Sequence, residues 1–542
     1  MTSQTISPHG LATGVQGLGW QGPTTALEFE EKGMQQCLLA LESPLWAVSA
    51  NNRTALTTSG SLSAAPGDPA LLAFAPAVPL EALGDPAFSA TYGTRYALYA
   101  GAMANGIASV ELVVALGKAG FFGSFGAAGL APERIEAAIQ HVQAALPDSP
   151  YAFNLINNPF ESAMEQCAAD LYVRYHVPVV EASAYLDITP GLVHYRAAGL
   201  SQNPDGSIKI GHHILAKLSR KEVARRFLAP APQELLARLV SDGKISAEQA
   251  ELARQVPMAD DITVEADSGG HTDNRPLVGL LPTMIALRDE LQAKFQYTVP
   301  VRIGAAGGIS TPQAALAAFM MGAAYVVTGS VNQACVEAGA SDHTKALLAQ
   351  AEMPDVTMAP AADMFEMGVK VQVLKRGTLF AMRASKLYEL YTHYATWEEI
   401  PAEERNKLEN NVFKRTFAEI WGDTVKFFNE RDSRMIERAE KDAHQKMALV
   451  FRWYLGLSSR WSNRGEPGRE MDYQIWCGPS MGSFNDWTRG GYLSEPANRH
   501  VADVALQILT GAAYLARLRS LGLQGVHLPA ALDQYRPEQP LI

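Results

Sequence analysis

From about residue 96, the hydrophobic pattern alternates short apolar runs with amphipathic segments. The segments between the runs, such as "PERIEAAIQHVQAAL" and "TPQAALAAFMMG", have apolar residues at helical spacing. The runs are "YALYAGAM", "GFFGSFG", "YAFNLI", "PVVEASA", "HHILAKLS", "ITVEAD", "VRIGAAGG" and "YVVTGS". Continuous apolar strands separated by helices are typical of a parallel sheet covered on both faces. Eight such units within about 235 residues predict an α/β fold, a (β/α)8 TIM barrel.

The regions on either side of the barrel pattern differ from it. Residues 1–95 are rich in Gly, Pro, Ser and Thr and contain a predicted hairpin, "LWAVSANNRTALTTSG", which turns at its Asn-Asn pair. The charged stretch 219–255 is too long for a simple connection and predicts a helical insertion after the fifth strand. The strand signal fades after residue 345. We therefore predict an N-terminal β-containing region (1–95), a barrel (96–345) and a mainly helical C-terminal domain (346–542).

The composition narrows the class of protein. The 542 residues are 47 % hydrophobic and carry a net charge of -11 without a long Lys/Arg cluster, which disfavours a nucleic-acid binder. The four cysteines lie far apart without metal-ligand spacing, as in a reducing compartment. No signal peptide is evident, and the most apolar run, "AALAAFMMGAAYVVTGSV", fits a helix followed by a buried strand better than a membrane span. We expect a cytoplasmic protein with no metal and no membrane or nucleic-acid partner.

Two common nucleotide motifs, G-x-G-x-x-G and the P-loop, are absent from the sequence. The segment "GPSMG" matches the G-x-S-x-G pattern of a hydrolase nucleophile at Ser480. Turn-rich residues follow it, and the region before it is predicted to be helical. Because the nucleophile pattern needs a strand before it and a helix after it, we interpret the segment as a structural turn.

Glycine-rich turns follow the seventh and eighth predicted strands, in "AAGGIS" and "TGS". In barrels, the loops after these two strands commonly bind phosphate through backbone N–H groups. Gly307, Gly308 and Gly329 would let such groups approach phosphate oxygens, and Ser330 adds a hydroxyl. Ordinary tight turns would have the same composition, but their occurrence in two consecutive units favours a phosphate site.

A histidine stands at the predicted end of the sixth strand, directly after a glycine pair, in "EADSGGHTDNRP". Catalytic groups lie at the carboxyl ends of barrel strands, so Gly269, Gly270 and His271 are candidate site residues. Lys217 and Asn154, near the ends of the fifth and third strands, would face the same mouth. A barrel-end salt bridge explains Lys217 equally well.

Taken together, the motifs resemble a known family. "GAMANGIASVELVVALGKAGFFGSFGAAG", "YAFNLINNP", "EADSGGHTDNRP", "RIGAAGGIS" and "VVTGS" resemble the nitronate monooxygenase-like flavoproteins, FMN-binding (β/α)8 barrels that include bacterial enoyl reductases. "DMFEMGVKVQVLKRGTLFAMRASKLYELY" and "IWCGPSMGSFNDWTRGGYL" are similar to the trans-acting enoyl reductases (PfaD type) of polyunsaturated fatty acid synthases and trans-acyltransferase polyketide synthases. The similarity covers nearly the whole chain.

The resemblance implies roles for individual residues. His271 lies where the family has its catalytic histidine, and the glycines before it would make room for a flavin face. Two departures from the family pattern are present. "VEADS" precedes "GGH" where the family more often has Gly-x-Glu-Ala, which affects the polar contacts of the flavin ring, and "TGS" replaces "MGT", which is conservative for phosphate binding. The implied FMN-binding set is Ala102, Met103, Asn154, Lys217, Gly269, Gly270, Gly307, Gly308, Thr328, Gly329 and Ser330.

The implied reaction is an FMN-dependent reduction of a trans-2-enoyl thioester, driven by NADPH or NADH. His271 would hydrogen-bond the thioester oxygen or donate a proton, an effect typically worth about 10²–10⁴-fold. Two alternatives stay open at this point. The chain could oxidise nitronates, with His271 as a base, or it could be a flavin-stabilised docking subunit without turnover.

The sequence has no G-x-D-S-[LI] attachment site for phosphopantetheine, so the acyl carrier protein would be another polypeptide. Carrier domains are usually acidic, and this chain is acidic too, so docking would need a local basic patch. A solvated face, or positions that support the fold, would explain such a patch equally well. A homodimer is compatible with the sequence. The candidate patch in "KVQVLKRGTLFAMRASK" consists of Lys370, Lys375, Arg376, Arg383 and Lys386.

Overall fold

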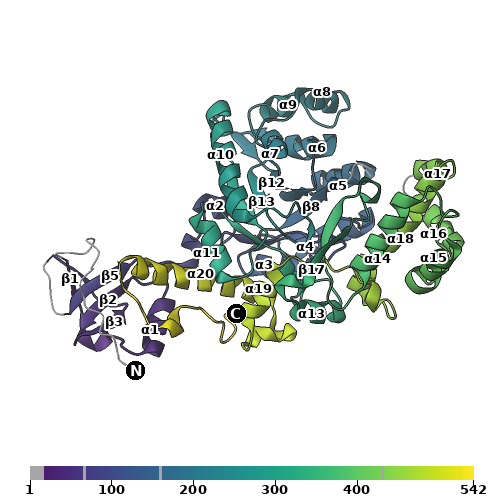
Figure 1. The fold of residues 1–542 in the computed structure, drawn as a ribbon. Coiled ribbons are helices and arrows are strands. Elements are labelled where there is room, and N and C mark those ends of the chain that lie inside the picture. Colours follow the sequence, from purple (N-terminus) through teal and green to yellow (C-terminus); the bar gives the residue numbers. More distant parts are fainter. Residues whose placement is uncertain (1–17, 65–68, 158–161, 430–432) are drawn as a thin grey trace.

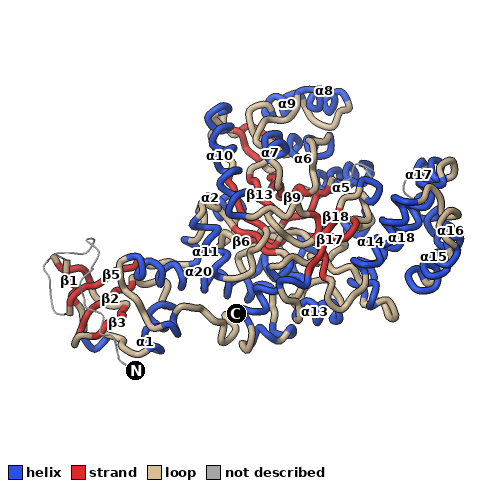
Figure 2. The backbone as a smooth tube through the Cα atoms, viewed as in Figure 1, coloured by secondary structure: helices blue, strands red, loops and turns tan. Residues whose placement is uncertain are grey.

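The computed structural model describes residues 18–64, 69–157, 162–429 and 433–542, and its centre is a closed barrel of eight parallel strands. Every predicted apolar run contains one strand of this barrel, so the predicted fold class is confirmed. The strands follow one another around the barrel in chain order, and Figure 2 shows them enclosed by helices. They are β6 (Leu98–Ala100), β7 (Phe122–Phe125), β8 (Ala152–Ile156), β9 (Val179–Ser183), β12 (His213–Leu218), β13 (Asp261–Glu265), β15 (Arg302–Ala306) and β16 (Val326–Thr328).

Helices connect the strands, and side-chain caps explain where several of them begin. Ser109, Thr189 and Thr311 each accept a hydrogen bond from a backbone N–H in the first turn of the following helix. The helical insertion predicted after the fifth strand is present as α7 (Lys221–Phe227), α8 (Gln233–Ser241) and α9 (Ala247–Ala253). The other barrel helices are α3 (Val110–Lys118), α4 (Pro132–Ala145), α5 (Ser162–Arg174), α6 (Pro190–Ala198), α10 (Leu277–Phe295), α11 (Pro312–Met320) and α12 (Ser330–Gln333).

The amino end of the barrel is closed by a short helix, α2 (Pro86–Tyr92). Asp85 caps this helix, with a proline at its first position and a left-handed glycine after its end. Phe88 stacks on Tyr325, with ring centroids 4.3 Å apart, and it is fully buried among residues near the starts of the barrel strands. Within the part of the chain that the structure describes, the barrel interior is therefore open to ligands at its carboxyl end and covered at its amino end.

The N-terminal region forms a small antiparallel sheet beside the barrel. The predicted hairpin is confirmed: β2 (Leu45–Ala50) pairs with β3 (Arg53–Thr57), and Asn51 and Asn52 both have positive φ, as a tight hairpin turn requires. β5 (Ala70–Ala75) pairs with the other edge of β2, and β1 (Gly19–Gln21) pairs with β4 (Ser61–Ser63). Helix α1 (Glu31–Leu39) packs against this sheet.

Beyond the barrel, the sequence analysis missed a sheet. β17 (Val356–Pro360) and β18 (Lys370–Leu374) are antiparallel, and β18 also pairs with the two-residue strand β14 (Gly270–His271). The remainder is helical, and Figure 1 shows α14 to α18 standing on the side of the barrel away from the N-terminal sheet. These helices are α13 (Asp342–Ala349), α14 (Phe380–His393), α15 (Ala402–Lys407), α16 (Phe417–Asn429), α17 (Arg434–Ala439), α18 (Ala443–Arg464) and α19 (Ser480–Thr488).

The last helix, α20 (Val501–Leu523), joins the barrel to the N-terminal region (Figure 1). Gly511 lets it approach α11, because a Cβ there would lie 2.4 Å from Pro312. The buried guanidinium of Arg517 donates to the carbonyls of Leu38, Ala40 and Ser43. Among the described residues, α20 is the one helix whose length and composition would suit a membrane span, yet 89 % of its apolar window is buried in the protein. We therefore interpret it as a core helix, one that the sequence analysis did not single out.

The apolar run that the sequence analysis did single out is α11 followed by β16, as predicted. The predicted domain boundary at residue 346 stays a prediction. In the structure, the elements beyond it pack in two places, with α14, α16 and α18 around a separate apolar cluster and α20 in the main core.

Candidate active site

A cavity of about 700 Å³ opens at the carboxyl end of the barrel. A volume of this size is typical of sites for cofactors and small molecules. Every residue that the sequence analysis assigned to the site lines this cavity, although the residues come from six different strand ends or loops. The structure therefore brings the predicted set together, while the role of each residue stays a prediction.

Buried charges form the floor of the cavity. Lys217 on β12 lies between two carboxylates, with its Nζ 3.2 Å from Oε1 of Glu181 and 3.6 Å from Oε1 of Glu265. Burial opposes its charge, but these carboxylates outweigh burial and raise the pKa of Lys217. Glu181 also accepts a hydrogen bond from the N–H of Ala102, at 3.0 Å. The structure thus shows the barrel-end salt bridge that was the alternative for Lys217, and the lysine lines the cavity as well.

The sequence analysis missed Glu181 and Glu265, although a signal was present. Each glutamate interrupts an otherwise apolar run, in "PVVEASA" and "ITVEAD". A charged residue within a buried strand needs a partner, and a lysine on the strand between them provides one. Burial raises the pKa of Glu265, because the low-polarity surroundings disfavour its ionised form.

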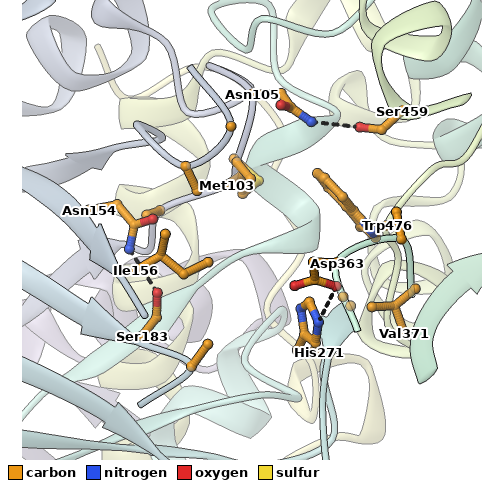
Figure 3. A pocket seen from close by; sticks show the side chains of 18 of the residues that line it. Met103, Asn105, Asn154, Ile156, Ser183, His271, Asp363, Val371, Ser459 and Trp476 are labelled. Carbon is orange, nitrogen blue, oxygen red and sulfur yellow. Dashed lines mark hydrogen bonds and ion pairs between the residues drawn. The ribbon is translucent and has the colours of Figure 1, made fainter. Parts of the chain in front are cut away.

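His271 lies in the cavity wall, but not at the end of the sixth barrel strand as predicted. β13 ends at Glu265, and His271 belongs to the separate strand β14, which is held in place by pairing with β18. Its Nε2 lies 3.2 Å from Oδ1 of Asp363, which comes from the loop between β17 and β18 (Figure 3). The long-range partner explains why the sequence pattern did not reveal Asp363.

The His271–Asp363 pair is charged over a wider pH range than a free histidine would be. Burial disfavours the imidazolium, but the carboxylates of Asp363 and Glu265 outweigh burial and raise the pKa of His271. Burial likewise disfavours the carboxylate of Asp363. The attraction of the nearby His271 is stronger than this effect of burial, so the pKa of Asp363 is lowered. The pair meets the distance of an ion pair without the directed geometry of a hydrogen bond.

The structure gives each member of the glycine pair before His271 a reason to be glycine. A Cβ on Gly269 would lie 2.8 Å from the backbone nitrogen of Cys477, and one on Gly478 would lie 2.9 Å from the nitrogen of Gly269. The two loops therefore touch backbone to backbone. Gly270 has a φ of +82°, which favours glycine. The lack of a side chain at Gly269 accommodates the C-terminal segment, and the role of the glycine pair toward a flavin stays a prediction.

The two turns predicted to bind phosphate have geometry that suits this role. Gly307 and Gly308 have φ values of +83° and +79°, and a Cβ on Gly308 or Gly329 would meet nothing within 4 Å, so both face open space. The Ser330 hydroxyl accepts the N–H of Gly478 at 3.0 Å and still has its own proton to donate. A phosphate would fit against these turns, and the cavity has room for a planar ring system beside them.

The side walls of the cavity combine polar and apolar groups. Figure 3 shows Asn154 and Ser183 on one side and His271, Asp363 and Trp476 on the other. The amide nitrogen of Asn154 donates to Oγ of Ser183 at 2.8 Å. Trp476 was not predicted, because it reaches the cavity from a segment that follows the helical region.

The helical region forms the outer part of the cavity, and the sequence analysis missed this contribution as well. The side chains come from α16 and α18, and the apolar ones among them extend the cavity away from the charged floor. Helical periodicity marked these residues only as one face of each helix. The apolar residues are Phe427, Phe428, Leu449, Trp453 and Leu457.

The structure contradicts the idea of one free basic patch in residues 370–386. Arg383 is largely buried and pairs with Asp472, so it supports the fold. Arg376 pairs with Asp355 at 3.1 Å, and Lys386 pairs with Glu389 at 2.9 Å. Within the described chain, Lys370 and Lys375 are the members of the set that are exposed and have no recorded ion pair.

The segment "GPSMG" lies in the cavity wall but lacks the context of a nucleophile. Ser480 is the first residue of α19, and a single bridge residue, Trp476, precedes it instead of a strand. The segment before it is not helical, and the residues after it form the helix α19 instead of a turn, so both local predictions are wrong. The strand–turn–helix arrangement that the nucleophile pattern requires is therefore not met.

Comparison with known proteins agrees with this geometry. Residues 86–396 match the family model of nitronate monooxygenase, which covers more than half of the chain. The chain belongs to this family. Residues 20–77 match the family model of the N-terminal domain of the fatty acid synthase subunit PfaD. Residues 394–473, which include α15 to α18, match the inserted helical domain of acyl-carrier-protein S-malonyltransferase.

Individual relatives come from synthases. A polyunsaturated fatty acid synthase subunit of Thraustochytrium sp. is 52 % identical over 446 residues, which cover 81 % of this chain and 30 % of that protein. The polyketide biosynthesis protein PksE of Bacillus subtilis is 46 % identical over 83 % of this chain and 58 % of its own length. The chain therefore spans less than two thirds of these relatives.

A solved structure matches along its whole length. The enoyl reductase domain of MlnA, from the macrolactin biosynthesis cluster of Bacillus amyloliquefaciens, is 39 % identical with a TM-score of 0.78. The match covers 82 % of this chain and 100 % of that domain. The chain thus belongs with the enoyl reductase-type domains of the synthases, in an oxidoreductase family.

Proposed function

We propose that the protein is a cytoplasmic, FMN-dependent enoyl reductase that acts in trans on thioesters carried by an acyl carrier protein, with NADPH or NADH as the reductant. The overall change consumes one reduced nucleotide and one proton and converts the 2-enoyl thioester to the saturated thioester. The observation that carries the proposal is the lining of the cavity, which combines the glycine turns and the His271 pair at the barrel mouth with apolar side chains from α16 and α18.

FMN is the cofactor that fits the barrel mouth. Gly307, Gly308, Gly329 and Ser330 would hold its phosphate, and Met103 and Asn154 would border its ring system. The chemistry that this cofactor supplies when bound is hydride transfer between a reduced pyridine nucleotide and an activated alkene. The charged floor carries two glutamates against one lysine, so it would not itself attract a phosphate.

His271 supplies the proton in this proposal. Its Nε2 is held near Asp363, so the proton on Nδ1 is the one available to the substrate. A hydrogen bond from Nδ1 to the thioester oxygen stabilises the negative charge that develops there, and the α-carbon then receives the proton. Asp363 is a positioning residue, because it acts on the substrate only through His271.

The apolar extension accounts for the acyl chain. Phe428, Leu449 and Trp453 would contact aliphatic carbons beyond the thioester, and burying each CH₂ group contributes about 0.8 kcal/mol. A small nitronate has no such chain and would leave these walls unused. The extension therefore favours an enoyl thioester over the nitronate that gives the family its name.

The test is anaerobic turnover with the purified holoprotein. We expect oxidation of the reduced nucleotide to depend on added 2-enoyl thioester, with formation of the saturated thioester measured by mass spectrometry. Aerobic nitronate oxidation, assayed in parallel, should be slow. Efficient nitronate oxidation without thioester reduction would identify a nitronate oxidase, and a bound flavin that neither nucleotide reduces would identify a docking subunit.

A further inference from the structure

A second cavity, of about 590 Å³, adjoins the first. Asn105, Gly129, Leu130 and Arg460 line both cavities, so the two spaces meet at these residues. The second cavity lies between barrel helices α3 and α4 and the C-terminal end of α18. Neither the predicted site nor the proposed reaction makes use of it.

The charge of the second cavity is opposite to that of the protein. The chain has a net charge of -11, yet Arg134, Arg460 and Arg464 line this cavity together with His141, and the acidic side chain among them is Glu111. Arg134 and Arg464 are exposed and have no recorded ion pair within the described chain. A guanidinium group matches phosphate oxygens through paired N–H donors, so such a cluster is suited to a phosphate ester.

A buried donor in the same wall also lacks a partner. Nδ2 of Asn463 is buried and donates to no acceptor among the described residues. An unsatisfied buried amide is costly unless a ligand or water accepts its hydrogen bond. Asn463 lies between Arg460 and Arg464 in the sequence and lines the same cavity. Its amide is therefore a neutral hydrogen-bond donor beside their guanidinium groups.

The junction between the two cavities is held by a hydrogen bond between the barrel and the helical region. Nδ2 of Asn105 donates to Oγ of Ser459 on α18 at 3.0 Å (Figure 3). Gly129 is required here, because a Cβ at that position would lie 2.4 Å from Oδ1 of Asn105. This contact fixes the basic end of α18 beside the mouth of the reaction cavity.

We propose that the second cavity binds a phosphate group that is remote from the reacting atoms of the ligand in the first cavity. Under the proposed function, two ligands have such a group: the phosphopantetheine arm that carries the acyl chain, and the pyridine nucleotide. Both have a neutral or cationic reactive end and an anionic end. The inference rests on the proposed function only for the source of the phosphate, since its location follows from the cavity itself.

The experiment measures binding to the holoprotein by calorimetry, without turnover. The probes are 4′-phosphopantetheine, pantetheine, and the 2′-phosphate of ADP-ribose. In Arg134→Ala/Arg464→Ala, we expect the Kd of a probe whose phosphate occupies the cavity to rise about tenfold or more. Pantetheine, which lacks phosphate, should bind as it does to the original protein. In Arg134→Lys/Arg464→Lys, which keeps the positive charges, the Kd of the same probe should rise less.

The matched control is Arg238→Ala/Arg254→Ala, which removes the same charge from α8 and from the end of α9, outside both cavities. It should leave all Kd values unchanged. A selective loss for 4′-phosphopantetheine assigns the cavity to the carrier arm, a selective loss for the ADP-ribose derivative assigns it to the reductant, and loss of both shows a shared site. Two results would overturn the inference. One is that the original protein binds neither phosphate probe, and the other is that the double variant binds both probes with the same Kd values as the original protein.

Turnover separates this inference from the proposed function. If the carrier arm occupies the cavity, the double variant should have a raised KM for an enoyl-phosphopantetheine thioester and an unchanged KM for the enoyl N-acetylcysteamine thioester, which has no phosphate. Absence of any thioester reduction in the original protein would refute the proposed function, while the binding measurements would still decide whether the cavity takes phosphate.

Discussion

The two ends of the barrel are built from the same strands and have opposite character. At the amino end, Phe88 and Tyr92 of α2 cover the strand starts, and the buried Arg302 pairs with Asp261 through two hydrogen bonds. At the carboxyl end, Lys217 lies between two glutamates, and His271 pairs with Asp363 beside an open cavity. The amino end is closed, and its arginine is matched by one aspartate. The carboxyl end is open, and its lysine faces two glutamates, so the charges there are not matched one to one.

This difference separates stability from function. A buried ion pair that is matched and covered has no means of responding to a ligand, so its loss affects mainly the folded state. A charged group beside a cavity can exchange its interactions with a substrate, and its pKa then matters for chemistry. Substitutions at the amino end should therefore change the free energy of unfolding, and those at the carboxyl end should change cofactor binding or rate.

The largest effect expected at the carboxyl end is loss of the flavin. In Gly308→Asp, a carboxylate would stand beside the predicted phosphate site, and we expect flavin retention to be abolished because two anions would be brought together. Absorbance at flavin wavelengths after gel filtration measures retention. Gly308→Asn has similar bulk and tolerates the positive φ comparably, so it should retain much more flavin. Equal retention in both variants would place the phosphate elsewhere.

At the amino end, Phe88→Ala should destabilise the fold by about 3–5 kcal/mol, because it leaves a cavity in a fully buried aromatic cluster. Denaturant unfolding measures this loss. The kcat of the protein that stays folded should be close to the original value, since Phe88 is at the closed end. Leu523→Ala, at an exposed position, is the control and should change stability little. A large fall in kcat with unchanged stability would contradict the division between the two ends.

His271→Ala should slow the reduction of the enoyl thioester by about 100-fold or more, because the proton donor is lost. Single-turnover mixing of the reduced protein with substrate measures this step. Flavin content and its reduction by the nucleotide should be unchanged. His393→Ala, which removes an exposed histidine from α14, is the matched control. A normal rate in His271→Ala would remove the residue from the mechanism, and loss of flavin would make its role structural.

The pH dependence of the reduction rate should reveal the effect of Asp363 on the pKa of His271. Since the pKa of His271 is raised, its proton-donating form persists above its ordinary pKa of about 6.5, and activity should fall as the pH rises through the raised value. Asp363→Asn removes one of the carboxylates that raise this pKa, so the fall should move to lower pH. Glu265 and Lys217 also act on His271, in opposite directions, and stay in place. At pH 8 we expect a loss of about tenfold, because a loss of about 1.4 kcal/mol in the stabilisation of the imidazolium lowers its population about tenfold.

The same rate measured at pH 5.5 is the internal control, because the lower pH favours the protonated form of His271 in both proteins. An equal loss at both pH values would mean that Asp363 affects the geometry of the site instead of the pKa of His271.

The smallest expected effect concerns the surface beside the carboxyl end. Lys370→Glu/Lys375→Glu should raise the KM for a carrier-bound enoyl substrate a few-fold and weaken its salt dependence, because single rim charges act mainly on encounter. A short soluble thioester should be reduced as before. Lys32→Glu/Lys118→Glu, at exposed positions outside both cavities, is the control of equal charge. Equal loss on both substrates would move the docking site elsewhere.

Part of the carboxyl end could be predicted from the sequence and part could not. The turns at Gly307 and Gly329 follow consecutive strands, so their meeting at one edge follows from the parallel arrangement. Asp363 and Trp476, in contrast, reach the cavity from segments that are far away in the chain. No periodicity links them, because a non-local strand pairing, β14 with β18, sets their positions.

The basic segment 370–386 is a second case in which the sequence alone did not predict the arrangement of the side chains. Its charges are adjacent in the sequence, which suggested one patch. In the structure, Arg383 turns inward to Asp472, whereas Lys370 and Lys375 stay exposed, because β18 and α14 present different faces to the core. Whether a cation is a docking group or a support depends on a partner that lies 89 residues further along the chain.

The pattern of apolar runs and glycine-rich turns was enough to determine the barrel, its eight strands, the helical insertion and the turns after the seventh and eighth strands. These features depend on local periodicity, turn chemistry and the order of elements, all of which are written along the chain. Only the tertiary structure decided which end of the barrel is closed, why Gly269 must be small, and how α16 and α18 extend the cavity. Those features depend on contacts between distant segments, and such contacts form only when the buried faces of several elements are satisfied together.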